Sequence, residues 1–255
     1  MARTANPIRW RQSDWQLAAA GHRRVAHPVN EKPGQHGSHN YIRRHGRMTK
    51  AQSFGLETLV PNYVCRADEI ILRAAGKPVG VEIGFGMGHA LLDWAVSAPT
   101  WQLCGIELYK PGVGALAAGL HREGLAHVCI VEQPAQEVLA QIGADAIDEV
   151  RIFFPDPWPK KRHFKRRLIQ SDFVAALAQV LKPDGLVRLA TDWTPYAQWM
   201  RECFATCDAF CQEVDHIRQA NEAMVVDSAR QTTKFERRGE KLGHEIHDLV
   251  YRKTR

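Results

Sequence analysis

Short apolar segments alternate with helix-like segments through most of the sequence, and this alternation constrains the fold more than any other feature. Five apolar runs of strand length are each followed by a stretch with helical periodicity; they span residues 78–84, 101–108, 127–132, 148–156 and 186–192. A sixth run, HEIHDLVYRK (244–253), alternates in the manner of a strand that returns at an edge. Strands that alternate with helices are typical of a parallel sheet with right-handed crossovers. The sequence therefore predicts an α/β fold with a single doubly wound, mostly parallel sheet.

The first 46 residues lack this order. Their Gly, Pro, His, Asn and Arg residues follow no sustained period, which is typical of a flexible arm. From Met48 the pattern changes, because Thr49 can cap a helix that stops near Pro61. We therefore expect a basic flexible arm over residues 1–46 and one folded domain over residues 47–255.

Three simple features argue against membrane and secreted classes. No run of about 18 apolar residues is present, which argues against a transmembrane helix. The basic N-terminus MARTANPIRWRQSDW lacks the apolar core of a secretory signal. Six cysteines in a chain of this length do not form a disulfide framework. We expect a reduced, cytoplasmic protein that does not bind membranes.

Positive charge is concentrated in three segments. The net charge of +6 divides into +8 over residues 1–50, +6 over 151–170 and +4 over 230–255, so that the other 159 residues carry −12. A mildly acidic body with basic clusters is typical of a protein that binds nucleic acid along one path. Ordinary solvated surface charge is the alternative, and for the N-terminal arm alone both interpretations are equally good.

Carboxylates stand at the ends of the expected strands. One acid lies at or near the end of each of the five runs: Glu82, Glu107, Glu132, Asp156 and Asp192. Because ligands bind at the carboxyl ends of the strands in an open parallel sheet, five such acids in phase predict a binding edge. For any one acid taken alone, a helix cap or a solvated loop position is the simpler interpretation.

The first strand ends in a glycine motif formed by Glu82, Gly84, Gly86 and Gly88. A dinucleotide-binding turn requires the spacing G-x-G-x-x-G, and its third glycine is replaced here by a histidine. Glycines leave room where a ligand lies along the backbone, and an acid beside them suits a cationic ligand better than a pyrophosphate. Glu107 stands where such folds place an acid on ribose hydroxyls, which indicates a ribose without distinguishing between cofactors.

The most specific segment is FFPDPWPKKRHFKRR, residues 153–167. Its three prolines stiffen the loop around Asp156 and Trp158, because each fixes its own φ and restricts the residue before it. A basic run follows directly. An aromatic ring beside cations can serve as a platform for an unpaired base. The alternative is a proline-rich loop with a half-buried tryptophan.

Five motifs together give a family resemblance. EIGFGMG, GIEL, FFPDPWPKKRHFKRRLI, LATDW and TKFERRGEKLGH occur in the order found in bacterial tRNA (guanine-N7)-methyltransferases, and the likeness runs from about Tyr41 to the C-terminus. The chain thus resembles class I methyltransferases, which have a seven-stranded Rossmann-like sheet. The resemblance implies S-adenosylmethionine as cofactor and a guanine in the tRNA variable loop as substrate, methylated to 7-methylguanosine.

The resemblance also implies roles for individual residues. Cofactor-contacting positions are matched by Glu82, Gly84, Gly86, Gly88, Glu107 and Asp156, the last of which also matches the proposed catalytic residue. Substrate-binding positions are matched by Lys160, Asp192, Thr233, Lys234, Phe235 and Glu236. Whether Asp156 orients the base or holds the cofactor stays open.

One position departs from the family pattern. After the third strand, Pro134 stands where the family usually has an aspartate that can accept from the adenine amine. Proline has neither that carboxylate nor a backbone N–H. Two residues can compensate: Gln133 through its side-chain carbonyl, or Glu132 if the strand ends one residue early. We therefore expect Gln133 and Pro134 to line the adenine.

The expected reaction needs no general base, because N7 of guanine carries a free lone pair and no proton has to leave before it attacks a methyl sulfonium. Positioning and electrostatics should therefore dominate. No metal is expected. Cys203, Cys207 and Cys211 recur every four residues, which predicts one face of a single helix in preference to a metal site.

Two other functions remain compatible with these motifs. One is an S-adenosylmethionine-dependent methyltransferase that acts on another RNA or on a protein. The other is a tRNA-binding module with a degenerate nucleotide pocket, against which the intact EIGFGMG and PDPW motifs argue. The glycine spacing disfavours an NAD-dependent reductase.

Overall fold

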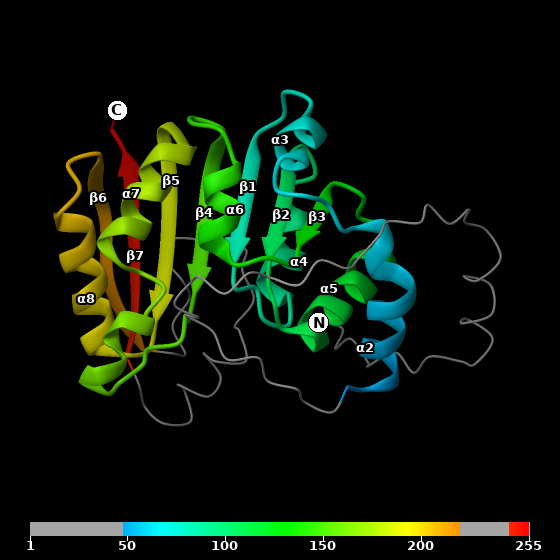
Figure 1. The fold of residues 1–255 in the computed structure, drawn as a ribbon, viewed down its shortest axis with the longest axis horizontal. Helices are drawn as coiled ribbons and strands as arrows, with labels where there is room; N and C mark the ends of the chain where they lie inside the picture. Colours follow the sequence, from blue (N-terminus) through cyan, green and yellow to red (C-terminus); the bar gives the residue numbers. More distant parts are fainter. Residues whose placement is uncertain (1–47, 220–244, 255) are drawn as a thin grey trace, which may run out of the picture. The chain divides into compact units, whose positions relative to one another are not determined.

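The computed structural model describes residues 48–219 and 245–254, which fall in one compact unit. The expected arm over residues 1–46 lies outside this part of the chain. The described residues form one sheet of seven strands with helices packed against it (Figure 1). In chain order the elements are α2 (Lys50–Phe54), η2 (Gly55–Leu59), η3 (Val60–Asn62), α3 (Glu69–Ala74), β1 (Val79–Ile83), α4 (His89–Ser97), β2 (Gln102–Ile106), α5 (Lys110–Glu123), β3 (Val128–Val131), α6 (Ala135–Gln141), β4 (Ile147–Phe153), η4 (Lys161–Arg166), α7 (Ser171–Val180), β5 (Leu181–Thr191), α8 (Thr194–Ala205), β6 (Phe210–Gln219) and β7 (Glu245–Lys253).

The strand order is β3-β2-β1-β4-β5-β7-β6. Strands β1 to β5 pair in parallel, whereas β7 is antiparallel to both β5 and β6. The arrowheads of β1 to β5 accordingly point to one edge of the sheet in Figure 1, and that of β7 points the other way. The predicted doubly wound, mostly parallel sheet is confirmed. The order reverses between β1 and β4, which is where an open α/β sheet offers a crevice for a ligand.

Two apolar layers bury the sheet from its opposite faces. Along β2, Leu103 packs with α4 and α5, whereas Cys104 and Ile106 pack with the layer that contains α6, α7 and α8. Successive strand residues point to opposite faces, so a strand covered on both sides needs apolar residues at every position. All five residues of β1 and all five of β2 are buried. This is why the parallel strands could be predicted as continuous apolar runs.

The described chain begins with the expected helix cap. Thr49 accepts from the backbone N–H of Gln52, whose side chain accepts in return from the N–H of Thr49. This reciprocal capping box satisfies two donors that the first helical turn would otherwise leave unpaired. The helical segment continues through η2 into η3, which contains Pro61, as the sequence predicted.

Two expectations about local structure are wrong. Strand β4 ends at Phe153 and not at residue 156, because Phe154 turns into the left-handed region with φ 51° and a proline follows. The three spaced cysteines do not share a helix: α8 ends at Ala205, Cys207 follows it and Cys211 lies on β6. No helix among the described residues is long and apolar enough to cross a membrane.

Candidate active site

The carboxyl ends of the parallel strands bring the expected residues to one edge of the sheet. Gly84 follows β1, Glu107 follows β2, Gln133 lies two residues beyond β3, and Asp192 follows β5. Asp156 lies three residues beyond β4. Parallel pairing therefore assembles a common edge from residues that are up to about a hundred positions apart in sequence.

The glycine turn leaves an open space at this edge. Gly84, Gly86 and Gly88 have φ values of +72°, +56° and +79°, which an L side chain rarely adopts. A Cβ atom added at Gly84 or Gly86 would meet no atom within 4 Å, whereas one at Gly88 would lie 2.8 Å from Leu116. The first two glycines therefore leave a cradle in which a ligand can lie, and Gly88 permits close packing of α4 against α5.

Glu107 fixes the cradle through backbone hydrogen bonds. Its Oε2 accepts from the N–H of Gly86 at 2.9 Å, and its Oε1 accepts from Leu108 at 2.7 Å and Tyr109 at 2.9 Å. One carboxylate thus joins the end of β2, the start of α5 and the middle of the glycine turn. Since a carboxylate offers about four acceptor positions, roughly one stays available to a ligand hydroxyl.

Beyond β3, the structure separates the two residues that could compensate for Pro134. Glu132 forms an ion pair with Lys110 at the start of α5, so its carboxylate is already engaged. The side-chain Oε1 of Gln133 is buried and has no hydrogen-bond partner within the described residues. A buried acceptor of this kind costs about 1–3 kcal/mol unless a donor reaches it. Gln133 is therefore the residue with a demand for a donor, such as an exocyclic amine.

The loop after β4 is strained and carries an exposed acid. Phe154 and Trp158 have φ values of +51° and +44°, and strain of this kind costs on the order of 1–3 kcal/mol per residue. Asp156 is exposed between them. The ring of Trp158 meets the edge of His163 at 5.6 Å between centroids and lies 5.0 Å from the guanidinium of Arg166. The tryptophan is thus held by the basic turn that follows it.

Arg167 anchors this loop from the interior. It is 1% exposed, its Nε donates to the carbonyl of Pro157 at 3.0 Å, and its guanidinium stacks 3.7 Å over the ring of Phe164. Tyr196 and Trp199 lie 4.9 and 5.2 Å from the same guanidinium. Burial lowers the pKa of Arg167, yet a guanidinium stays charged near neutral pH. Aromatic faces thus take the place of a carboxylate partner in tying the Asp156 loop to α8.

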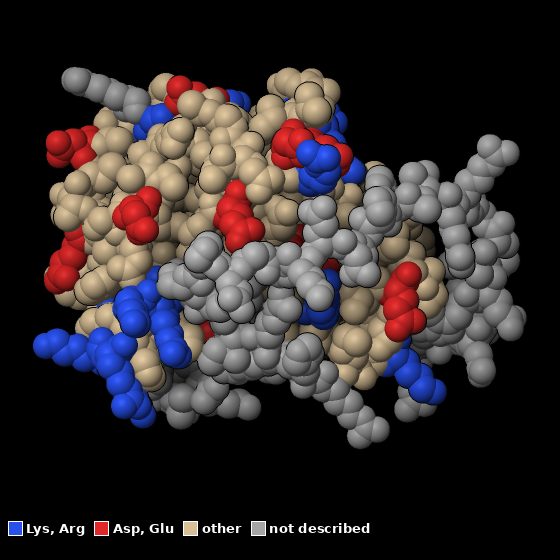
Figure 2. Space-filling view, viewed as in Figure 1, with Lys and Arg blue, Asp and Glu red and all other residues tan. Residues whose placement is uncertain are grey.

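Exposed cations surround the turn that follows. Lys160, Lys161, Arg162, Lys165 and Arg166 are all exposed, and Figure 2 shows Lys and Arg gathered at this end of the molecule. Partial burial, and then the charges of Arg166, Arg162 and Lys160, lower the pKa of His163, which keeps its ring neutral near pH 7. We call the five exposed cations, Lys160, Lys161, Arg162, Lys165 and Arg166, the η4 patch. It can hold a polyanion beside the Asp156 loop.

Comparisons with known proteins agree on a methyltransferase. A family model described as a putative methyltransferase matches residues 76–249. The tRNA (guanine-N(7)-)-methyltransferase of Pseudomonas savastanoi pv. phaseolicola is 41% identical over 223 residues, which is 84% of this chain and 89% of that protein. The protein of the same name from Pseudomonas fluorescens strain Pf-5 is 38% identical over 238 residues, 89% of this chain and 96% of that protein. The chain belongs to the tRNA (guanine-N7)-methyltransferase family.

Solved structures support the fold of this tRNA (guanine-N7)-methyltransferase family member. An antibiotic-related methyltransferase aligns with a TM-score of 0.57 at 15% identity, over 78% of this chain and 98% of that one. A 16S rRNA adenine-N1 methyltransferase variant from Catenulisporales acidiphilia, solved with its cosubstrate, aligns with a TM-score of 0.50 at 18% identity, over 75% and 92%. At these identities the likeness concerns the class I methyltransferase fold.

The residues that the tRNA (guanine-N7)-methyltransferase motifs single out differ in burial, and some of them lie outside the described residues. Glu82 is 3% exposed within β1, with its Cα opposite Gly105 of β2 and Arg151 of β4, so it lies in the sheet before the cradle begins. Lys160 is exposed at the start of η4, and Asp192 is half-buried after β5. The run Thr233 to Glu236 lies outside the described residues. No group of three metal-ligating side chains occurs within the described ranges.

Pro134 offers a direct test of whether the adenine of the cofactor lies beyond β3. It occupies the N-cap position of α6 with no side-chain cap. Pro134→Asp is expected to tighten S-adenosylmethionine binding about 2- to 13-fold, because the carboxylate adds one hydrogen bond to the adenine amine. Calorimetric titration measures this change, and Pro134→Ala controls for the loss of the proline ring. Weaker binding by a stably folded Pro134→Asp protein would show that the proline itself shapes the pocket.

Proposed function

We propose that this protein transfers the methyl group of S-adenosylmethionine to N7 of a guanine in the variable loop of tRNA, giving 7-methylguanosine. The observation that carries the proposal is the 41% identity, over 84% of this chain, to a protein named for that activity. The open cradle and the exposed η4 patch, which flank the same strand ends, support it. A tRNA substrate also favours the cytoplasm as the place of action.

We assign the cofactor to the part of this site formed by the residues that follow β1, β2 and β3. Gly84 and Gly86 leave the space, Glu107 keeps about one acceptor position for a ribose hydroxyl, and the buried Oε1 of Gln133 calls for a donor such as the adenine amine. We retain Glu82 and Pro134 as cofactor-binding residues in this proposal. When bound, S-adenosylmethionine supplies a methyl group on a cationic sulfonium.

We assign the methyl acceptor, the guanine, to the part of the site formed by the residues that follow β4 and β5. Asp156 is exposed on the strained loop, where it can orient the guanine, and Lys160 and Asp192 are the other substrate-binding residues that we assign to this side. Thr233 to Glu236 complete this proposed set. Since N7 attacks as a free lone pair, these residues need only align the base and favour positive charge on the purine over charge on the sulfur. The carboxylate of Asp156 therefore promotes the reaction only as far as it lies nearer to the purine than to the sulfonium.

The deciding experiment replaces the attacked atom. Purified protein is given methyl-labelled S-adenosylmethionine and a tRNA that has either guanine or 7-deazaguanine at the variable-loop position. We expect label only in the guanine-containing tRNA, released on digestion as 7-methylguanosine. Label in both RNAs, or at another nucleotide, would show that N7 of this guanine is not the methylated atom. A failure to label either RNA, while S-adenosylmethionine still binds, would favour a non-RNA substrate.

The η4 patch predicts a salt-dependent affinity for tRNA. Replacing Lys161 and Lys165 by glutamine is expected to reduce the log–log slope of tRNA affinity against salt by about 0.7–0.9 per lysine, because each contact releases counterions. Filter binding over a salt series measures the slope. Lys77, which is exposed near the start of β1 at the opposite edge, provides the matched control. An unchanged slope in the double variant would show that Lys161 and Lys165 do not contact the phosphates of the tRNA.

A further inference from the structure

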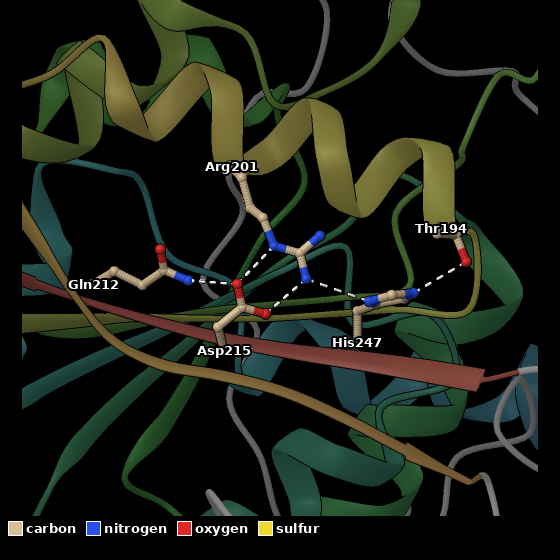
Figure 3. A network of polar contacts seen from close by, with 5 residues as sticks. All are labelled: Thr194, Arg201, Gln212, Asp215 and His247. Carbon is tan, nitrogen blue, oxygen red and sulfur yellow. Dashed lines mark hydrogen bonds and ion pairs between the residues drawn. The ribbon is translucent and has the colours of Figure 1, made fainter.

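A chain of polar contacts links β6, β7 and α8 (Figure 3). Arg201 of α8 donates from Nε and Nη2 to the two carboxylate oxygens of Asp215 on β6, at 2.7 and 2.6 Å. Gln212 donates to the same carboxylate at 2.9 Å. On β7, His247 has its Nδ1 3.4 Å from Nη2 of Arg201 and its Nε2 3.0 Å from Oγ1 of Thr194. The contacts therefore run from the edge of the sheet to the first residue of α8.

The donors in this chain determine the tautomer of His247. A guanidinium only donates, so Nδ1 must accept from Arg201 and the ring proton must lie on Nε2. Nε2 then donates to the hydroxyl of Thr194. His247 is 2% exposed, and burial, followed by the charge of Arg201, lowers the pKa of its ring. The ring therefore stays neutral at physiological pH, and the direction of each hydrogen bond is fixed.

His247 holds both ends of a short turn. Its backbone pairs with Thr191, the last residue of β5, and its side chain holds Thr194. Between these two points lie only Asp192 and Trp193. The N–H of Trp193 donates to Oγ1 of Thr191 at 3.3 Å, and its carbonyl accepts from the N–H groups of Tyr196 and Ala197 in the first turn of α8. One histidine thus spans the turn that contains Asp192.

The same histidine follows the second proposed acceptor segment in the sequence. Strand β7 begins at Glu245, directly after residues 220–244, and His247 is its third residue. Those residues include the run Thr233 to Glu236, which the proposed function assigns to substrate binding. Within the described residues, His247 therefore lies where β7 pairs with the end of β5, directly before the Asp192 turn.

Resting on the proposed function, we propose that His247 is a positioning residue for the tRNA acceptor, which acts by holding Thr194 and so fixing the turn that presents Asp192. Arg201 and Asp215 serve this role by fixing the imidazole. The cradle formed by Gly84 and Gly86 follows β1, on the other side of the switch point from β5 and β7. A change at His247 should therefore alter the affinity for tRNA and not the affinity for the cofactor.

Two pairs of variants separate the contacts of His247. His247→Asn keeps an acceptor at the Nδ1 position and loses the donor to Thr194, whereas His247→Gln keeps that donor and loses the acceptor. Thr194→Val removes the hydroxyl at constant shape, and Thr194→Ser restores it. Thr206→Val is the matched control, because its hydroxyl donates to the carbonyl of Cys203 at 2.7 Å at the other end of α8.

Steady-state methylation of tRNA gives the expected pattern. His247→Asn and Thr194→Val should raise the KM for tRNA about 2- to 13-fold, the effect of one lost hydrogen bond, with kcat and the Kd of S-adenosylmethionine unchanged. Thr194→Ser and Thr206→Val should stay within about twofold of the parent, and His247→Gln, which keeps the donor to Thr194 but loses the contact with Arg201, should fall between the parent and His247→Asn. A KM for tRNA that is unchanged in His247→Asn and Thr194→Val would overturn the proposal, as would an equal loss in Thr206→Val.

Hydrogen exchange tests the same inference without any substrate. The amides of residues 192–194 should exchange faster in Thr194→Val than in the parent or in Thr206→Val. Equal exchange would show that the side chain of His247 does not hold the turn. If the parent protein fails to methylate tRNA, the proposed function falls, and the exchange rates still decide whether His247 positions Asp192.

Discussion

The Gly84→Ala variant is expected to fold and to lose measurable binding of S-adenosylmethionine. At φ +72° a methyl group costs about 1–2 kcal/mol of stability through backbone strain. The added Cβ meets no protein atom within 4 Å, so it projects into the space that we assign to the cofactor. Urea unfolding measures the first effect, and calorimetric titration with S-adenosylmethionine measures the second.

Gly124→Ala provides the control for strain. Gly124 has φ +67° at the C-terminal end of α5, and a Cβ there also meets nothing within 4 Å. The two alanine variants should therefore lose similar stability, while only Gly84→Ala loses the cofactor. Equal cofactor affinity in both variants would place the ligand away from the glycine turn.

Glu107→Ala is expected to weaken S-adenosylmethionine binding by roughly 10- to 150-fold. The loss of the carboxylate removes the charge-assisted partner that we assign to the ribose, worth about 1.5–3 kcal/mol. It also leaves the N–H groups of Gly86, Leu108 and Tyr109 without their acceptor, so the cradle is no longer held to β2. Calorimetric titration measures the affinity, and thermal unfolding separates binding from stability.

Glutamine at the same position refines this test. Glu107→Gln keeps one oxygen but turns an amide N–H₂ toward backbone donors, so it should resemble alanine more than the parent. Glu123→Ala is the matched control, because Glu123 is an exposed residue of α5 whose carboxylate pairs with Arg122. Cofactor affinity that survives both changes at Glu107 would leave this residue with a purely structural role.

The parallel part of the fold could be predicted from the sequence because burial on both faces leaves a continuous apolar run. Strand β6 escaped this reasoning. Its residues, FCQEVDHIRQ, place charges on both faces, and β6 lies at the edge of the sheet with β7 as its one neighbour among the described strands. The spacing of Cys203, Cys207 and Cys211 suggested a helix there. A period of four residues is uninformative once the helix ends, as α8 does at Ala205.

For the candidate site, sequence reasoning located residues by strand ends and could not supply their partners. It identified Glu107 but not the three backbone donors that its carboxylate binds. It offered both Glu132 and Gln133 as replacements for the missing aspartate, and the structure distinguishes them by the ion pair of Glu132 with Lys110 and by the buried, unpartnered Oε1 of Gln133. Arg167 read as one more cation of a basic run, although it is buried among aromatic rings. Such contacts join distant positions, so local pattern carries no signal for them.

The antiparallel end of the sheet has a consequence for the order in which the protein assembles during synthesis. Strands β1 to β5 each find a neighbour that has been made before them, or soon after. Strand β6 has to wait, because β7, its partner among the described residues, is made later and enters between β5 and β6. Chains fold largely from the N-terminus as they emerge. The half to which we assign the cofactor is therefore able to form on the ribosome before the half to which we assign the RNA is complete.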